Sequence, residues 1–534
     1  MSLLRAITTV GGYTLISRVL GFVRDVLLAA LLGAGAAADA FVVAFKLPNL
    51  FRRLFAEGAF NAAFVPLFAR RLTGEGRAAA RLFAEQAQAV LLLALLIFVV
   101  IAEVTMPWAM RFVAPGFIAD PAKFQLAVEL TRITFPYLLF VSLVSLIGGV
   151  LNSLERFAAT SATPIFLNLV MIAGLVLWQW YAPTAAHGAA WGVTVAGFAQ
   201  LVWLALVLRS AGLGLRLRRP RLTPEVKRLL VLMLPVALGA GVYQINVVID
   251  VVIASFLPSG AVSFLYYADR LNQLPLGVVG IAIGTALLPI LARQIRAGEE
   301  AQALANQNRA LEVALVLTLP AAAALMVIAQ PIIAVLFERG AFGAEAVTAT
   351  ALALAAYACG LPAHVLAKVF TPGYFAREDT ATPVKIAVAV MAINAVLAVA
   401  LMLALRRYGM GHVGIALATS ITGWLNAGLL WRGLVRRGQF SLDARMRRRG
   451  LPILLAAAGM AGALALGHGL LAPWLGGPHY ERIVALIILI AVGAAVYGIV
   501  GQLLGAVDFR DLMSLLRPRR GQPPVTPPAG EPEP

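Results

Sequence analysis

The stretch that decides the fold is DAFVVAFKLPNLFRRLFAEGAF, residues 39–60, which is apolar enough for a membrane helix and yet contains ionisable residues throughout. A charge at the centre of a bilayer helix costs roughly 2.5–3.5 kcal/mol on insertion scales. Together with the preceding apolar segment, the first two predicted spans hold eight ionisable groups: Arg18, Arg24, Asp25, Asp39, Lys46, Arg52, Arg53 and Glu57. Five are cations and three are anions, so pairing among them leaves positive charge over. The sequence therefore predicts a buried, wet, cationic cavity whose ligand is an anion.

The composition places the whole chain in a membrane. Of the 534 residues, 61% are hydrophobic and only 13% are charged, which is typical of a polytopic membrane protein and not of a soluble domain. The net charge of +18 lies in short loops between apolar runs, so it does not indicate nucleic-acid binding. A single cysteine, Cys359, excludes an internal disulfide framework.

Apolar runs of about 20 residues or more predict fourteen membrane-spanning helices, an all-α polytopic fold. Their predicted bounds are 8–32, 37–69, 86–109, 126–151, 161–182, 188–209, 228–257, 262–293, 311–337, 346–371, 383–405, 412–434, 450–472 and 482–506. With both termini on the inner side, 29 of the 43 Lys and Arg residues fall in inner loops, 6 in outer loops and 8 within the spans. This asymmetry agrees with the positive-inside rule, so we expect both termini to be cytoplasmic.

An internal repeat divides the chain into two six-helix lobes. A shift of 223 residues superimposes seven identical residues in the second helix of each half: Phe41, Asn49, Ala59, Ala63, Pro66, Ala69 and Arg70 on Phe264, Asn272, Ala282, Ala286, Pro289, Ala292 and Arg293. Six crossings separate the halves, so the repeats are parallel, which is a common transporter architecture. The expected organisation is a lobe 1–210, a basic linker 211–227, a lobe 228–435, a basic loop 436–449, two additional helices in 450–506 and a basic, then proline-rich disordered tail 507–534.

The charges do not follow the repeat. The first two helices of the front half carry a net +2 in the membrane, whereas their counterparts hold Asp250, Asp269 and Arg270, a net −1. Charges that only held helices together would be needed in both halves, so the asymmetry favours a ligand site in the front half. Arg18 and Asp25, seven residues apart, share a helix face and could pair, and Asp269 could pair locally with Arg270.

Residues 33–66 closely resemble the MurJ (MviN) lipid II flippase family, which belongs to the multidrug/oligosaccharidyl-lipid/polysaccharide exporter superfamily. The resemblance extends over residues 1 to about 510 and includes four further motifs: SRVLGFVRD at 17–25, YYADRL at 266–271, PGYFAR at 372–377 and TPVK at 382–385. It implies two six-helix lobes in a V shape, with helices thirteen and fourteen forming a groove for the lipid tail. It also implies that the essential cavity cations of the family correspond to Arg18, Arg24, Arg52 and Arg270.

The remaining charges receive other roles. We expect Asp25, Asp39, Glu57 and Asp269 to close the cavity or to hold its helices, and Lys46 and Arg53 to line it, with their exact roles open. In sodium-linked members of the family an aspartate matching Asp250 joins polar residues of the eleventh helix. Here Asn394 is the candidate partner for such a cation site.

The resulting hypothesis is a flippase of the bacterial inner membrane, not an enzyme, that moves the undecaprenyl-diphosphate-linked peptidoglycan precursor lipid II to the outer leaflet by alternating access. No cofactor is expected; the membrane potential or a monovalent cation would drive transport. We expect a monomer in contact with membrane lipids, with cell-wall synthesis proteins as candidate partners. The alternatives are an exporter of another polyprenyl-diphosphate-linked oligosaccharide, a drug exporter, which would favour cavity carboxylates over cations, and a lipid-carrier-dependent glycosyltransferase, for which no Asp-x-Asp pair is present.

Overall fold

The computed structural model describes residues 3–53 and 60–506, and every regular element within these ranges is helical. The predicted tail 507–534 and Glu57 lie outside the described residues. The front half contains α1 (Leu3–Leu32), α2 (Ala36–Phe51), α3 (Asn61–Gly74), α4 (Gly76–Val113), η2 (Pro115–Ala119), α5 (Pro121–Thr134), α6 (Tyr137–Ser153), α7 (Phe157–Leu177), η3 (Trp178–Trp180) and α8 (Ala185–Ser210).

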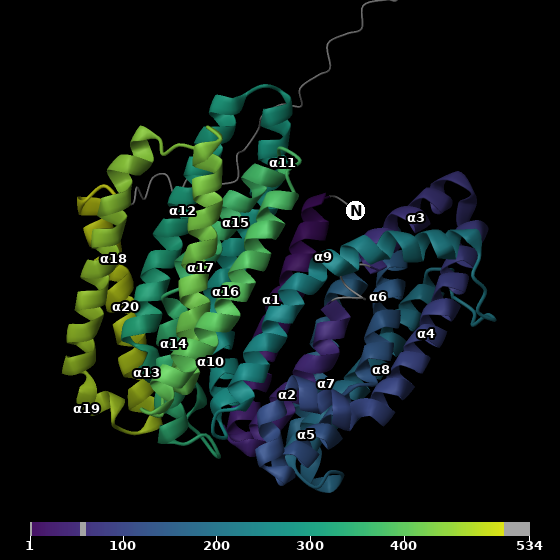
Figure 1. Cartoon of the computed structure of the whole chain (residues 1–534), viewed down its shortest axis with the longest axis horizontal. Helices are drawn as coiled ribbons and strands as arrows, with labels where there is room; N and C mark the ends of the chain where they lie inside the picture. Colours follow the sequence, from purple (N-terminus) through teal and green to yellow (C-terminus); the bar gives the residue numbers. More distant parts are fainter. Residues whose placement is uncertain (1–2, 54–59, 507–534) are drawn as a thin grey trace, which may run out of the picture.

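The second half contains α9 (Pro224–Ser255), α10 (Ala261–Pro275), the π-helical turn η4 (Leu276–Gly280), α11 (Ile281–Arg296), α12 (Glu300–Val327), α13 (Ala329–Phe337), α14 (Ala344–Ala358), α15 (Leu361–Phe375), α16 (Ala381–Arg406) and α17 (Gly411–Arg436). The chain continues with α18 (Ala444–Leu470), the short α19 (Ala472–Leu475) and α20 (His479–Leu503). In Figure 1 the helices α2–α8 gather on the right and α10–α20 on the left, with α1 and α9 between them.

Eleven helical stretches in the described ranges are long and apolar enough to cross a membrane. They coincide with eleven of the predicted spans, namely the third to sixth and the eighth to fourteenth. The first predicted span is α1, the second is divided between α2 and α3, and the seventh is α9, of which only residues 244–255 form a shorter apolar helix by the same criterion. The multi-pass membrane fold is confirmed, and the number fourteen stays a prediction.

Five of the predicted spans are interrupted in the structure. The second, fourth, eighth, ninth and tenth predicted spans are each broken into two helices. Proline explains three of these breaks: Pro136 follows the end of α5, Pro331 lies in the first turn of α13 and Pro362 in the first turn of α15. A proline lacks the N–H that would bond to the carbonyl four residues earlier, so the helix is interrupted just before it.

The second helix of each half departs from α-helical geometry at the same place. Arg52, Arg53 and Phe60 are π-helical in the front half, and η4 at Leu276–Gly280 is π-helical in the second. The shift of 223 residues found in the sequence places Arg52 on Pro275, directly before η4. π-Helical turns are rare and frequently mark functional sites, so this shared break directs attention to the residues around it.

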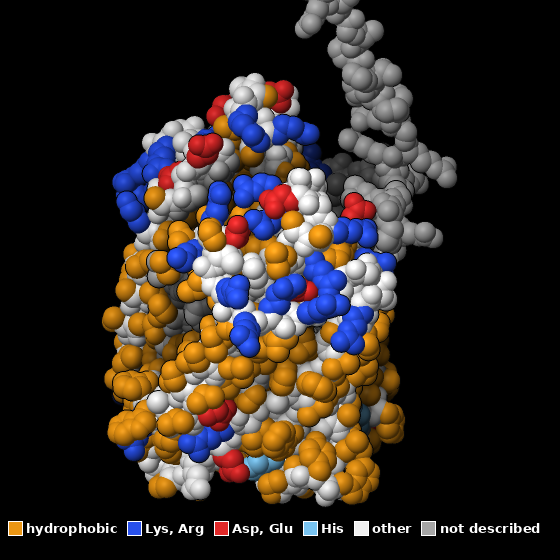
Figure 2. All heavy atoms as spheres, turned by 90° about the vertical axis from the view of Figure 1, so that its right-hand side faces the viewer, with side chains coloured by type: hydrophobic (Ala, Val, Ile, Leu, Met, Phe, Trp, Pro, Cys, Tyr) orange, Lys and Arg blue, Asp and Glu red, His pale blue; other side chains and the backbone are white. Residues whose placement is uncertain are grey.

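The two halves meet at the end of the molecule that carries the loops after α1, α4, α9 and α13, which we name the closed end. Here the N–H of Ala341 donates to the carbonyl of Ala30 at 2.8 Å, and the N–H of Gly116 donates to Oγ of Ser255 at 3.0 Å. The opposite end carries the segment between α8 and α9, and we name it the linker end. Figure 2 shows one face of the molecule, on which a wide hydrophobic belt lies below a concentration of Lys and Arg side chains.

Candidate functional site

Asp39 is the centre of a buried cluster that joins the two halves at the closed end. Its side chain is fully buried and accepts hydrogen bonds from Nζ of Lys123 at 2.7 Å, from the N–H of Gly260 at 2.8 Å, and from the N–H and Oγ of Ser263 at 2.8 and 2.7 Å. Lys123 is itself only 5% exposed. We call these four residues the clasp. Because α10 begins here, the carboxylate also satisfies the free N–H groups of a helix N-terminus, where negative charge is favoured.

The clasp depends on a glycine. Gly260 has φ +103°, a left-handed conformation that L side chains rarely adopt. A Cβ atom at this position would also lie 2.9 Å from the carbonyl oxygen of Ala34. The close approach of the two halves at this point therefore requires glycine.

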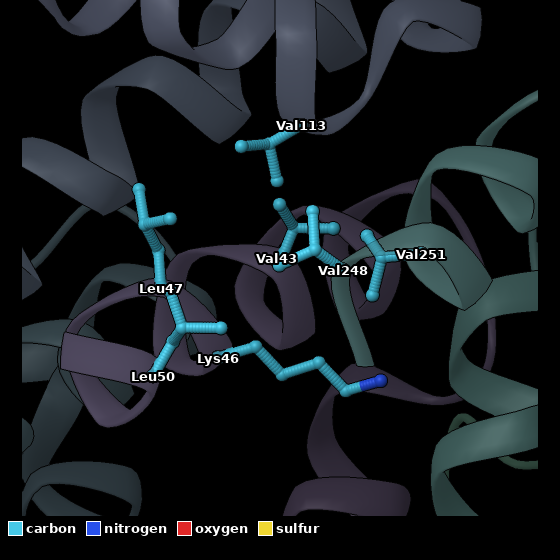
Figure 3. A pocket seen from close by; sticks show the side chains of 7 residues that line it. All are labelled: Val43, Lys46, Leu47, Leu50, Val113, Val248 and Val251. Carbon is cyan, nitrogen blue, oxygen red and sulfur yellow. The ribbon is translucent and has the colours of Figure 1, made fainter. Parts of the chain in front are cut away.

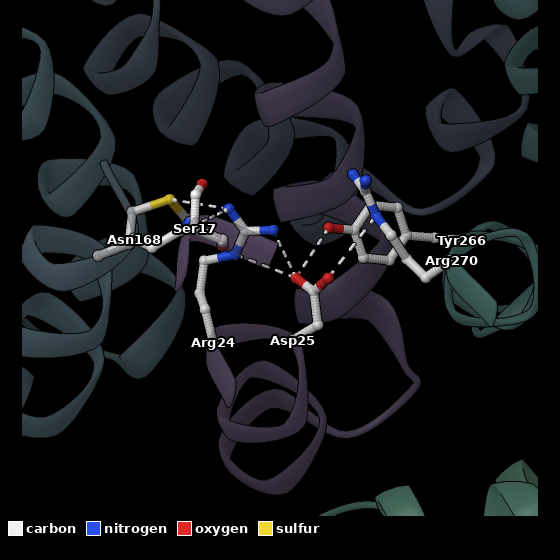
Figure 4. A network of polar contacts seen from close by, with 7 residues as sticks. Ser17, Arg24, Asp25, Asn168, Tyr266 and Arg270 are labelled. Atoms are coloured by element: carbon white, nitrogen blue, oxygen red, sulfur yellow. Dashed lines mark hydrogen bonds and ion pairs between the residues drawn. The ribbon is translucent and has the colours of Figure 1, made fainter. Parts of the chain in front are cut away.

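Arg24 and Asp25 form a second buried network, in the last third of α1 (Figure 4). Arg24 donates from Nε and Nη2 to Oδ1 of Asp25 at 3.0 and 2.7 Å, and from Nη1 to Oδ1 of Asn168 at 2.9 Å. Asn168 in turn donates to the carbonyl of Ser17 at 2.9 Å. Arg24 and Asp25 are only 6% and 5% exposed. The expected pair of Asp25 with Arg18 is therefore wrong, since the carboxylate is held by its sequence neighbour.

The second half reaches the same carboxylate from the other side. Tyr266 donates its hydroxyl to Oδ1 of Asp25 at 3.3 Å, and Nε of Arg270 lies 3.7 Å from Oδ2 (Figure 4). The guanidinium of Arg270 also lies over the Tyr266 ring, 4.7 Å from its centroid. The expected local pair of Arg270 with Asp269 does not form, because Asp269 accepts a hydrogen bond from Gln273. Asp25 thus lies between two guanidinium groups, one from each half.

Three other predicted cavity cations form no close ion pair among the described residues, although Lys46 lies near enough to Asp250 and Asp269 to be attracted by both. Arg18 and Arg53 are exposed, and Lys46 is half-buried; none of the three makes a hydrogen bond or ion pair within the described ranges. Lys46 borders a small pocket with about 280 Å³ of empty space, formed with Val43, Leu47, Leu50, Val113, Val248 and Val251. Figure 3 shows its ammonium group extending away from these apolar side chains. Arg52 donates from Nε to Oδ1 of Asn49 at 3.0 Å.

The turn η4 is contacted by two cations from different helices. A Cβ at Gly277 would lie 3.1 Å from Nη1 of Arg18, and a Cβ at Gly280 would lie 2.9 Å from Cδ of Lys368 and 3.2 Å from its Nζ. The two glycines therefore leave room for a guanidinium and an ammonium to approach the turn. Lys368 belongs to α15, and its sequence context gave no reason to place it in the cavity, since a lysine near a span end can simply extend to the interface.

Asp250 and Asn394 are brought together, as predicted. Nδ2 of Asn394 lies 3.4 Å from Oδ1 of Asp250 and 3.2 Å from Oδ1 of Asn246, while its Oδ1 accepts from Thr422 at 3.0 Å. Within the described ranges no cluster of three or more His, Cys, Asp or Glu residues could hold a metal ion. With this amide orientation Asn394 presents N–H groups to Asp250, so a cation between them would require the amide to turn over.

Sequence reasoning did not identify the residues that bind these buried charges. Lys123, Ser263 and Tyr266 were not candidates, and Asn168 gave no signal. Each lies far along the chain from the charge that it contacts: Lys123 is 84 residues from Asp39, and Tyr266 is 241 residues from Asp25. Among the predicted residues, Arg24, Asp25 and Arg270 form one network, and Asp39 lies apart from them in the clasp.

Comparisons with known proteins agree with this architecture. The family described as lipid II flippase MurJ matches residues 28–485. A probable lipid II flippase MurJ of Rhizobium meliloti is 48% identical over 504 residues, covering 93% of each chain, and the lipid II flippase MurJ of Burkholderia cenocepacia is 38% identical over 472 residues, covering 87% of this chain and 90% of its own. The solved structure of lipid II flippase MurJ in an inward closed conformation superimposes with a TM-score of 0.76 at 26% identity, covering 94% of this chain and 99% of that one. An inward-facing multidrug transporter of the MATE family shares the fold, with a TM-score of 0.65 at 16% identity over 79% of this chain and 95% of its own.

Proposed function

The chain belongs to the lipid II flippase MurJ family, and we propose that it moves lipid II from the inner to the outer leaflet of the bacterial inner membrane by alternating access. It is a transporter and not an enzyme, as are the flippases to which it is related. The observation that carries the proposal is the set of cavity cations, Arg18, Lys46 and Arg53, that form no close ion pair among the described residues. A diphosphate supplies the negative charge that this set lacks.

We infer that the substrate cavity opens toward the linker end, away from the clasp. The clasp of Asp39, Lys123, Gly260 and Ser263 holds the halves together at the closed end. The linker end faces the cytoplasm, because basic residues concentrate in the loops on that side. Lipid II therefore enters from the inner leaflet, and release of the clasp opens the opposite side.

In this conformation the Asp25 carboxylate occupies the position beside Arg270 that a phosphate of the substrate would take. Its contact with Arg270 is loose, 3.7 Å from Nε, whereas its contact with Arg24 consists of two hydrogen bonds. A diphosphate can replace Asp25 at Arg270 at low cost and leave the pair with Arg24 intact. Arg18, Lys46, Arg52 and Arg53 complete the anion site. Arg24 positions Asp25 in this conformation, and Arg24 contacts the substrate itself in another conformation.

The chain forms fourteen spans in two six-helix lobes, with α18 and α20 as an addition. The shift of 223 residues and the shared π-helical break in α2–α3 and η4 support the two-lobe arrangement. Helices α18 and α20 pack on each other and on α12 and α13. This places an apolar surface beside the second lobe, where the polyprenyl tail can remain in lipid while the head group crosses. The protein acts as a monomer, in contact with membrane lipids and with cell-wall synthesis proteins.

Transport is coupled to the membrane potential or to a monovalent cation at Asp250 and Asn394. The oxygens of Asp250 and Asn246 are suitable ligands for such a cation once the Asn394 amide has turned over. The site offers one carboxylate, so weak binding is expected. Flux into vesicles, measured with and without sodium and with an imposed potential, distinguishes the two sources; Asp250→Asn abolishes only the cation-dependent part.

The function is tested by lipid II flux in vesicles that contain the purified protein. Arg18→Ala and Lys46→Ala are each expected to lower flux by about tenfold or more, the equivalent of one charged hydrogen bond to phosphate. Arg407→Ala is the matched control, because Arg407 is an exposed cation that contacts the Tyr408 ring and lies outside the cavity. Normal flux in both cavity variants would refute the proposal.

Another polyprenyl-diphosphate-linked oligosaccharide is the second candidate substrate, because it presents the same diphosphate to the same cations. Competition decides between the two. If an undecaprenyl-diphosphate-linked glycan without a peptide inhibits lipid II flux as strongly as unlabelled lipid II does, the cavity recognises the diphosphate and does not distinguish the attached head groups.

A further inference from the structure

The segment between α8 and α9 is an extended strap that is pinned to the front half. Residues 213–223 have no regular secondary structure. Glu85 of α4, which is 1% exposed, accepts hydrogen bonds from the backbone N–H of Arg216 at 3.0 Å, from the Arg218 side chain, and from Nε of Arg81 at 2.9 Å. The hydroxyl of Thr223 donates to Gln86 at 3.3 Å. The course of the strap over α4 is therefore fixed by the fold.

The outer side of the strap combines exposed leucines with unpaired arginines. Leu217 and Leu222 are 70% and 58% exposed. Arg216, Arg219 and Arg221 are exposed, and their side chains make no ion pair within the described part of the chain. From residue 209 to residue 228 the chain carries seven basic residues and one acidic residue. A soluble loop of this length has no reason to present two large apolar side chains to water among so many cations.

The strap lies at the edge of the hydrophobic belt. Glu85 fixes its height on α4. Leu82, one turn before Glu85, is exposed, and the further exposed apolar side chains of that helix begin at Leu93, Leu96 and Ile97. Eight residues of α-helix separate Glu85 from Leu93, about 12 Å along the axis. The headgroup region is about 5–8 Å deep on each side of the bilayer, so the strap lies at the outer surface of that region, from which its arginine side chains reach the lipid phosphates. Figure 2 shows the corresponding pattern, with Lys and Arg side chains directly above the belt.

We propose that this strap binds the anionic phospholipid headgroups of the leaflet at the linker end. Arg216, Arg219 and Arg221 pair with lipid phosphates, and Leu217 and Leu222 enter the interface between headgroups and acyl chains. The position at the belt edge favours lipid over a soluble acidic protein, which would meet the cations but not the leucines. The strap would thereby anchor the front half to the membrane surface, independently of the substrate cavity.

The test uses the full chain in nanodiscs of phosphatidylcholine, with or without phosphatidylglycerol in place of a third of the lipid. An environment-sensitive fluorophore is attached at Leu217→Cys in a Cys359→Ser background, since Cys359 is exposed. With phosphatidylglycerol present we expect a blue shift, quenching by a lipid-borne quencher, and loss of both at high salt, where the Debye length is shorter. A probe at Glu299→Cys, in the exposed loop between α11 and α12, is expected to stay in water in either disc.

Arginine substitutions show whether charge causes the insertion. Arg216→Gln, Arg219→Gln and Arg221→Gln keep the backbone N–H and the Arg218 side chain that bind Glu85, so the strap stays in place. Native mass spectrometry is expected to show about fivefold less retained phosphatidylglycerol for each arginine removed. The proposal is overturned if the Leu217 probe is equally open to a water-soluble quencher in both discs, if the triple variant retains as much anionic lipid as the unmodified chain, or if only an added acidic protein shields the probe. Because the readouts do not involve transport, they stand apart from the flux test.

Discussion

Helix α2 carries two sets of charges whose surroundings differ. At its start Asp39 is fully buried and accepts four hydrogen bonds, from Lys123, Gly260 and Ser263. Seven residues later, about 10 Å along the axis, Lys46 has no ion pair within the described ranges, and the same is true of Arg53, which follows the end of α2. A buried charge persists only with a partner, so the start of α2 holds the halves together while its later residues leave positive charge available to a ligand.

The largest effect is expected when the clasp is broken. Asp39→Asn leaves the ammonium of Lys123 buried without a counter-charge. It also gives the N–H groups at the start of α10 a neutral acceptor in place of a charged one. Removal of one partner of a buried pair lowers the free energy of unfolding by about 3–5 kcal/mol. Denaturant unfolding in detergent measures the loss. The double variant Asp39→Asn with Lys123→Met should lose less than the single variant, and equal stability of Asp39→Asn and the unmodified chain would show that the clasp contributes nothing.

A smaller loss is expected at the Arg24 network, because Asp25 has other partners. Arg24→Met removes two hydrogen bonds to the Asp25 carboxylate and one to Asn168, yet Tyr266 and Arg270 remain beside it. We expect a decrease of about 1.5–3 kcal/mol in the free energy of unfolding, the range of one hydrogen bond to a charged group. Asn168→Leu is the matched variant that leaves the ion pair and removes its neutral partner. A larger loss in Asn168→Leu than in Arg24→Met would assign the stability to packing around α7 and not to charge.

Lys368 is a further cation without an ion pair in the described ranges, and sequence reasoning did not select it as a cavity residue. Its side chain lies against Gly280. Lys368→Met is expected to leave unfolding unchanged and to reduce lipid II flux by a few fold, since a half-exposed charge contributes up to about 1 kcal/mol. Lys368→Arg should retain most of the flux. Unchanged flux in Lys368→Met would exclude this lysine from the substrate path.

Local pattern predicted which charges lie within the spans, but not what they contact. The cost of charge in a span singled out Asp39, Lys46 and Arg53 directly. The shift of 223 residues aligned the two positions at which the structure has a π-helical break, but the break itself was not predicted. The ion pairs and hydrogen bonds of these charges were not predicted, because the partner side chains come from distant segments of the chain, as Lys123 does for Asp39. Helical spacing also favoured the wrong partner for Asp25, because the long arginine side chain of residue 24 can curl back to the adjacent carboxylate once Asn168 is beside it.

The smallest effect concerns a charge pair outside the membrane-spanning segments. Asp379 precedes α16 and accepts hydrogen bonds from the N–H of Thr382 at 2.9 Å and from Arg437 at 2.6 Å. The hydrogen bonds from Thr382 and the Arg437 guanidinium lower the pKa of Asp379 from 3.8 to about 2. A depressed carboxyl pKa stabilises the fold above the unfolded-state value, and the contribution is lost as the pH falls toward the folded-state value. We therefore expect the contribution to disappear between about pH 4 and about pH 2, and to stay below about 1 kcal/mol because the pair is open to solvent.

Asp379→Asn should abolish this part of the pH dependence, and thermal unfolding across the same interval measures it. The neighbouring Glu378→Gln is the control, since Glu378 is exposed and its side chain makes no ion pair within the described ranges. If both variants flatten the curve equally, general charge repulsion at low pH explains it. If Asp379→Asn alone does so, and by far less than Asp39→Asn costs at neutral pH, the difference between the two aspartates is due to burial: each is bound to a cation, but only at Asp39 does loss of the carboxylate leave that cation without water to replace it.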